Sequence, residues 1–172
     1  TPRTLFPYTT LFRSSSLRRL ALGLGISALA GLCLGIAAGT LPLFGAPLSP
    51  LLTVLSMVPP LAILPILFIV FGLGELSKVM LIVIGVTPCL ARDLEQRARE
   101  IPVELLVKAQ TLGASTWTLM LRVVLPQLLP RLLISLRLML GSAWLFLIAA
   151  EAIASTEDRK STRLNSSHPG YL

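Results

Sequence analysis

The chain has 172 residues, of which 54% are hydrophobic and 13% charged, and its mean hydropathy is +0.82. These proportions exclude an ordinary soluble globule of this length and predict an all-α membrane protein, a polytopic helical bundle. The formal charge of +7 would favour nucleic acid or anionic lipid as a partner, but much of that charge lies at the two ends of the chain.

Both ends look foreign to the rest of the chain. TLFPYTTLFRS, residues 4–14, and DRKSTRLNSSH, residues 158–168, resemble in-frame translations of the two adapters of a short-read sequencing library. We therefore expect residues 1–14 and 158–172 to be foreign tails, and residues 15–157 to be part of a natural protein that is longer at both ends. Without the tails, ten basic and seven acidic residues remain, so nucleic-acid binding loses its main support.

The first expected membrane span covers residues 20–40, because about 20 apolar residues cross ~30 Å of hydrocarbon. Small residues recur at every fourth position, which aligns them on one face where a second helix can approach closely. They are Gly23, Ser27, Gly31, Gly35 and Gly39. Tight helix packing is expected on this face; a lipid-facing helix with incidental glycines is the alternative. Cys33, and Cys89 in a later span, are expected to be small buried packing residues.

Three further spans are expected along the chain. LFGAPLSPLL reads as a connection into a short interfacial helix at about residues 51–58. The second span, PPLAILPILFIVFGLG, contains three prolines, of which Pro59 and Pro60 are interpreted as a bend at the entry. The third covers residues 78–91, or more if its helix begins near Glu75. The fourth covers about residues 132–154.

Charge is concentrated between residues 92 and 122. The five basic residues there outnumber the single Lys78 of the preceding turn, and short loops rich in Lys and Arg stay cytoplasmic. We therefore expect this segment in the cytosol. By parity the start of the chain lies outside, although Arg18 and Arg19 argue against that orientation.

The pattern within this segment predicts two short helices. Pro102 suits a first helical turn, and Gly113 stands where a helix commonly ends in a left-handed residue. Ser115 is a suitable N-cap for a second helix, which Pro126 would bend into the membrane. The first helix carries an apolar stripe of Leu105, Ala109 and Leu112. Such a stripe in a cytosolic loop requires a partner, either another protein or the chain's own spans.

The segment resembles the EAA loop of bacterial ABC importer permeases. That pattern is Glu-Ala-Ala, three residues, Gly, nine residues, an aliphatic residue, any residue and Leu-Pro. Here Gly113 is followed by nine residues and then by VVLP, residues 123–126. Val107, Lys108 and Ala109 occupy the Glu-Ala-Ala positions, so only the second alanine is kept. The surrounding stretches, from about residue 16 to 155, are similar to permeases of the nitrate, sulfonate and taurine type.

The resemblance implies a type I ABC importer permease, with about four spans in this chain and a multi-pass homodimer in the bacterial inner membrane. It implies that the loop at about residues 92–125 docks on a separate cytosolic ATPase, while a periplasmic or lipoprotein binding protein delivers a small, anionic solute. The implied coupling residues are Leu105, Leu106, Val107, Lys108, Ala109, Gly113, Val123, Leu125 and Pro126. Of these, Leu105, Leu106 and Ala109 are expected to be buried by the ATPase, with Lys108 at the rim.

Motifs for catalysis are absent from the sequence. It has no GxxxxGK[ST] phosphate loop and no HExxH motif, and its one histidine, His168, lies in a tail. We expect no ATP hydrolysis by this chain and no catalytic residue, metal or cofactor.

Two other functions remain open. The chain could be part of a secondary transporter or channel that needs no ATPase, or an inactive fragment. A secondary transporter would need ionisable groups near the bilayer midplane, where Arg137 is the clear candidate for a pathway residue. Arg137 could equally snorkel or bond helix carbonyls. Glu151 lies near the expected outer interface, too far along the helix to pair with Arg137.

Overall fold

The computed structural model describes the backbone of residues 6–166 and the side chains of residues 15–155. This part of the chain is helical and contains no strand, which confirms the all-α membrane bundle. The elements are α1 (Phe6–Thr40), α2 (Pro42–Met57), α3 (Pro60–Phe71), α4 (Glu75–Arg99), α5 (Val103–Thr111), α6 (Thr116–Leu119), the π-helical turn η1 (Met120–Val124) and α7 (Leu125–Ser166). α1 and α7 thus extend into the ranges expected to be foreign.

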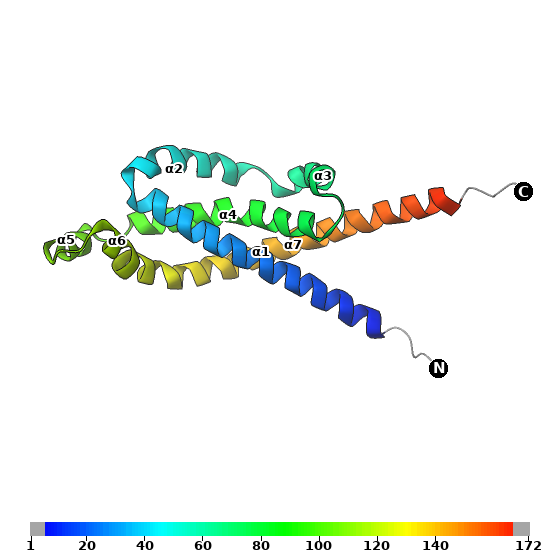
Figure 1. Ribbon diagram of the computed structural model, residues 1–172, viewed down its shortest axis with the longest axis horizontal. Coiled ribbons are helices and arrows are strands. Elements are labelled where there is room, and N and C mark those ends of the chain that lie inside the picture. Colours follow the sequence, from blue (N-terminus) through cyan, green and yellow to red (C-terminus); the bar gives the residue numbers. More distant parts are fainter. Residues whose placement is uncertain (1–5, 167–172) are drawn as a thin grey trace, which may run out of the picture.

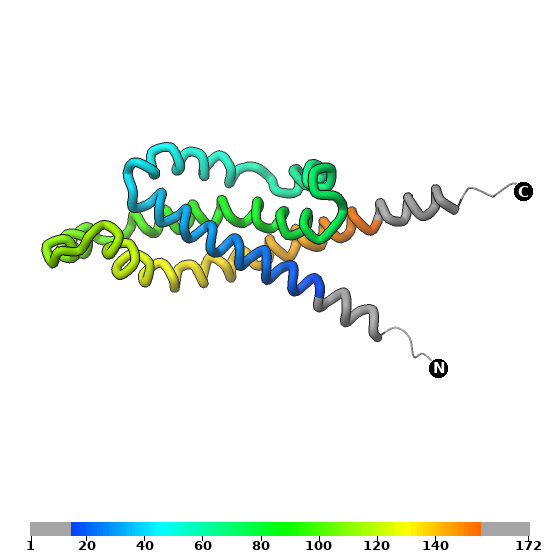
Figure 2. Tube along the Cα trace, in the orientation of Figure 1, coloured from blue at the N-terminus to red at the C-terminus, as the bar shows by residue number. Residues whose placement is uncertain are grey.

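The chain travels along the long axis of the bundle four times (Figure 2). α1 and α4 run in one direction, and α2 and α7 return in the other (Figure 1). Within the described residues, Ser15–Thr40 and Thr116–Ser155 are long and apolar enough to cross a membrane. The pair α2 and α3 adds a third candidate, broken by a 92° bend. The α5–α6 segment lies at one end of the bundle, which we call the coupling end.

The stripe of small residues on α1 lies against α4. A Cβ added at Gly35 would lie 2.7 Å from the Cβ of Leu94, and one added at Gly39 would lie 2.6 Å from the Cβ of Ala98. Gly23 and Gly31 meet Ile82 and Leu90 in the same way. Ser27 is fully buried and donates a 2.8 Å hydrogen bond to the carbonyl oxygen of Gly23. The two parallel helices are therefore packed so closely along the stripe that little room remains for side chains on α1.

The region expected to be a connection is instead a helix of 16 residues, α2. Pro42 occupies its first turn, where a missing N–H costs no helical hydrogen bond. α2 ends before Val58 and Pro59, which are both extended, and α3 starts at Pro60. The bend expected at Pro59 and Pro60 is thus confirmed. α3 crosses the outer part of the bundle and buries Leu64 and Leu67 against α4 and α7.

α4 begins at Glu75, the earlier of the two expected starts, and continues to Arg99. Residues 92–99 were expected in the loop, but they belong to this helix. The cause is burial, because Leu94, Glu95 and Ala98 continue the face that packs on α1. The segment that leaves the bundle is correspondingly shorter.

The expectation that both cysteines are buried is wrong for Cys33, which is exposed. Gly31 and Gly35 face α4, so the residue midway between them points away from that contact. Cys89 is half-buried, and its thiol lies 3.9 Å from the carbonyl oxygen of Ser56.

Candidate functional site

α5 is held by a complete set of C-terminal hydrogen bonds. The N–H of Gly113 donates to the carbonyl of Gln110 at 2.9 Å, and the N–H of Ala114 donates to the carbonyl of Ala109 at 3.0 Å. Gly113 has φ +82°, a left-handed conformation in which a Cβ is disfavoured. A Cβ there would meet no other atom within 4 Å, so the requirement for glycine comes from the backbone alone.

α6 starts at the N-cap expected from the sequence. The Ser115 hydroxyl accepts a hydrogen bond from the N–H of Thr118, and the left-handed turn at Gly113 leads directly into this cap. The helix then widens into η1, in which the N–H of Leu125 donates to the carbonyl of Met120. Pro126 follows and has no N–H to donate, so the wide turn precedes the point where the helical ladder is interrupted. α5, α6 and η1 together with Leu125 and Pro126 form what we call the coupling segment.

One face of α5 packs on the bundle itself. Leu106 and Ala109 pack against a cluster of buried side chains where the end of α4, α6, η1 and the start of α7 meet. This cluster consists of Ala98, Ile101, Leu119, Val124 and Leu128. Leu106 and Ala109 are thus half-buried within the chain itself, and the expectation that an ATPase buries them stays a prediction. Of the stripe read from the sequence, only Ala109 packs on this cluster, whereas Leu105 and Leu112 are exposed.

Other side chains of α5 and of the turn after it are apolar and exposed. Leu105 and Val107 are 42% and 48% exposed, and Leu112, just beyond the helix, is 88% exposed. Trp117 on α6 adds an indole that is 68% exposed. Lys108 is exposed as well. We call Leu105, Val107, Lys108, Leu112 and Trp117 the outer face of the coupling segment.

The last three residues of the EAA-like pattern have a different environment. Val123 and Leu125 are half-buried within η1 and at the start of α7, and Pro126 is exposed. The side-chain amide of Gln127 donates to the carbonyl of Val123 at 3.1 Å. This part of the pattern shapes the turn that joins the coupling segment to α7.

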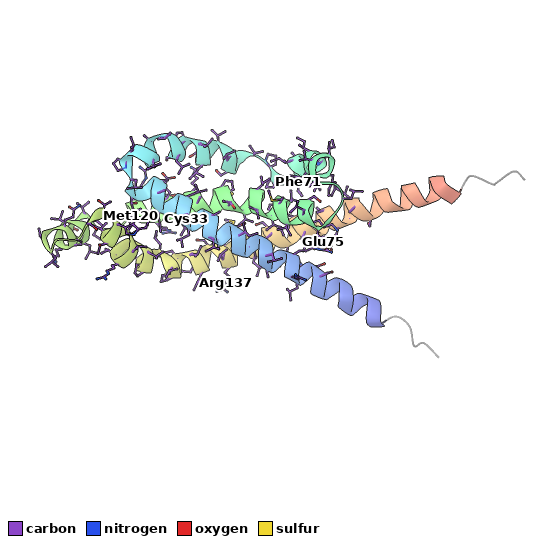
Figure 3. All side chains as sticks on the ribbon, in the orientation of Figure 1. Cys33, Phe71, Glu75, Met120 and Arg137 are labelled. Carbon is purple, nitrogen blue, oxygen red and sulfur yellow. The ribbon has the colours of Figure 1, made fainter. Side chains whose placement is uncertain are left out.

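The far end of the bundle is closed by an ion cluster that sequence reasoning missed. Arg19 of α1 donates to the carboxylates of both Glu75 on α4 and Glu151 on α7, the latter at 2.6 Å. Ser16 also donates to Glu151, at 2.7 Å. Glu75 and Met120 lie toward opposite ends of the four-helix part of the molecule (Figure 3). The sequence did offer one sign of this cluster, because Arg18 and Arg19 stand at the start of an apolar span. In the structure, Arg19 pairs with two carboxylates.

Arg137 lies on the exposed side of α7, away from α1 and α4 (Figure 3). The polar contact between α4 and α7 is made instead by Ser135, whose hydroxyl donates to Asp93. Among the described residues, no group of three or more His, Cys, Asp or Glu side chains is arranged to hold a metal ion.

Comparisons with known proteins give the family. Residues 31–167 match the model of the binding-protein-dependent transport system inner membrane component. The chain is 38% identical over 143 residues to the taurine transport system permease protein TauC of Escherichia coli K12, covering 83% of this chain and 52% of the relative. It is 36% identical to the putative aliphatic sulfonates transport permease protein SsuC of Bacillus subtilis, covering 82% of this chain and 51% of the relative.

A third relative is named for a different solute. The bicarbonate transport system permease protein CmpB of Synechococcus elongatus is 36% identical, again covering 82% of this chain and 51% of the relative. The chain thus spans about half the length of the curated relatives it matches. Since the family match covers most of the chain, this protein belongs to the binding-protein-dependent transport system inner membrane components, the permease subunits of ABC importers.

Proposed function

We propose that the protein containing this chain is the membrane subunit of an ATP-driven importer and that the coupling segment docks on a separate cytosolic ATPase. The observation that carries the proposal is the division of α5 into two faces. Leu106 and Ala109 anchor the helix in the bundle, while the outer face presents Val107, Lys108 and Leu112 to the surroundings. A short amphipathic helix held in this way can enter a groove of a partner without unfolding.

The orientation follows from the charges. The coupling end carries most of the basic residues and lies in the cytosol, and the Arg19 cluster lies at the outer surface. A solute-binding protein would then deliver its cargo at the Arg19 end. The membrane is the bacterial inner membrane and the permease acts as a homodimer.

The solute is a small molecule with an anionic group, of the sulfonate, taurine or bicarbonate class. Three relatives with similar identity are named for taurine, aliphatic sulfonates and bicarbonate. All three solutes carry an anionic group. The family resemblance and these names support the anionic class, without selecting one member of it.

The test is co-purification of the ATPase with the full-length permease in detergent. Leu112→Asp places a charge at the most exposed apolar position of the outer face, so we expect loss of most of the bound ATPase, with unfolding changed by less than about 0.5 kcal/mol. The matched control is Leu43→Asp, which places the same charge at an 81% exposed leucine in the first turn of α2 at the same end of the bundle, where ATPase retention should be unchanged. Full retention by Leu112→Asp would favour a transporter that works without an ATPase.

We also propose that residues 1–14 and 158–172 do not belong to the natural protein. Their likeness to translated adapters supports this at both ends. Sequencing the parent gene in a single long read tests it, and a read that encodes TLFPYTTLFRS in frame would contradict it.

A further inference from the structure

A groove between α2 and α4 at the coupling end carries a positive charge that no described carboxylate neutralises. Arg92, Gln96 and Arg99 lie on one face of α4, at spacings of four and three residues, opposite Ser49 and Thr53 of α2. Together with Glu95 they line a cavity of about 220 Å³. A second cavity of about 510 Å³, at the turn between α1 and α2, shares Ser49 and Arg99 with it.

The charges in the groove do not cancel. Glu95 is 5% exposed and accepts a 2.8 Å hydrogen bond from Arg99, so its carboxylate is already paired. Arg92 forms no ion pair with any described side chain and contacts only the hydroxyl of Ser56, at 3.3 Å. The groove therefore keeps one net positive charge, on Arg92. A guanidinium has five N–H donors, so most donors of both arginines remain available.

The other side of α4 shows that this surplus is local. Arg97 lies 3.8 Å from Asp93 and 3.3 Å from Glu100, and Asp93 also accepts a hydrogen bond from Ser135. That face, which meets α7, is balanced by its own carboxylates. The partial negative charge of the helix C-terminus acts mainly over the last turn, and Arg92 lies about two turns before the end.

We propose that the α2–α4 groove binds an oxyanion, a phosphate or sulfonate group, between the guanidinium groups of Arg92 and Arg99. Two flat guanidinium forks match the geometry of such a group, and the free hydroxyl of Ser49 and amide of Gln96 can complete its hydrogen bonds. The cavity admits one such group. Because the groove opens at the basic ends of the spans, the group comes either from a phospholipid headgroup or from a free anion.

The experiment uses the full-length permease in detergent and does not depend on ATPase docking. The probes are phosphatidylglycerol, phosphatidylcholine, inorganic phosphate and ethanesulfonate. Bound lipid is counted by native mass spectrometry, and stabilisation is measured as the shift in the midpoint of thermal unfolding. The variant is Arg92→Gln, and the matched control is Arg122→Gln, which removes an exposed charge at the same end outside the groove.

We expect Arg92→Gln to weaken binding of the anion about fivefold, while Arg122→Gln leaves it unchanged. Preference for phosphatidylglycerol without an effect of the small anions would assign the site to lipid. Stabilisation by phosphate or ethanesulfonate, without lipid preference, would assign it to a free anion. Gln96→Glu adds a carboxylate to the groove and should weaken binding similarly, so it carries the test if Arg92→Gln does not fold. Equal binding by the wild type and the groove variants would overturn the proposal.

Discussion

The two ends of the bundle are stabilised by different kinds of interaction. At the far end, one arginine joins α1, α4 and α7 through Glu75 and Glu151, so the polar groups there satisfy one another. At the coupling end, α5 and α6 are held by capping hydrogen bonds and by two apolar side chains, and the outer face stays uncovered. Charged side chains thus pair with one another at the far end, whereas apolar side chains stay exposed at the coupling end.

The α1–α4 contact runs between the two ends of the bundle. Disrupting it has the largest expected effect on the free energy of unfolding. Gly39→Leu would place a side chain against the Cβ of Ala98 and the carbonyl oxygen of Glu95, neither of which can rotate away. We expect the full-length permease to lose about 3 kcal/mol of unfolding free energy. The measurement is unfolding in mixed detergent micelles. Gly25→Leu is the control, since a Cβ there meets nothing within 4 Å, and equal losses would contradict close packing at Gly39.

Removing the arginine of the far end should have the next largest effect. Arg19→Ala leaves Glu75 and Glu151 without their shared cation, and we expect a loss of about 2 kcal/mol, because the arginine side chain is only 12% exposed while the two carboxylates are more open. The same unfolding assay measures it. Arg18→Ala is the control, at a neighbouring exposed position. ATPase binding at the other end should be retained, and its loss would show that the two ends are not independent.

A small backbone change at the coupling end should act locally. Gly113→Ala keeps the space around the turn open but strains the left-handed conformation by roughly 1 kcal/mol. Protease cleavage between α5 and α6 should become faster, with little change in global unfolding. Gly74→Ala serves as control, because Gly74 has φ −76° and equally open surroundings. If cleavage rates match in the two variants, the left-handed turn does not stabilise the segment.

The sequence by itself determined the features that depend on neighbours along the chain. Hydropathy predicts the spans, and the small residues at every fourth position from Gly23 to Gly39 predict a face for close packing. The ends of α5 and α6 follow from Gly113 and Ser115, because left-handed backbone and N-capping are properties of a few adjacent residues. The EAA-like spacing was sufficient to indicate the family to which the chain belongs.

Only the tertiary structure decided which partner each face meets. The stripe of α5 was interpreted as a docking face, but its Ala109 packs, together with Leu106, on a buried cluster of the chain itself, since burying apolar surface within the chain is as favourable as burying it against another protein. Likewise, Glu75 and Glu151 come beside Arg19 only in the folded bundle. Such pairings join residues up to 132 positions apart, and periodicity along one helix carries no information about them.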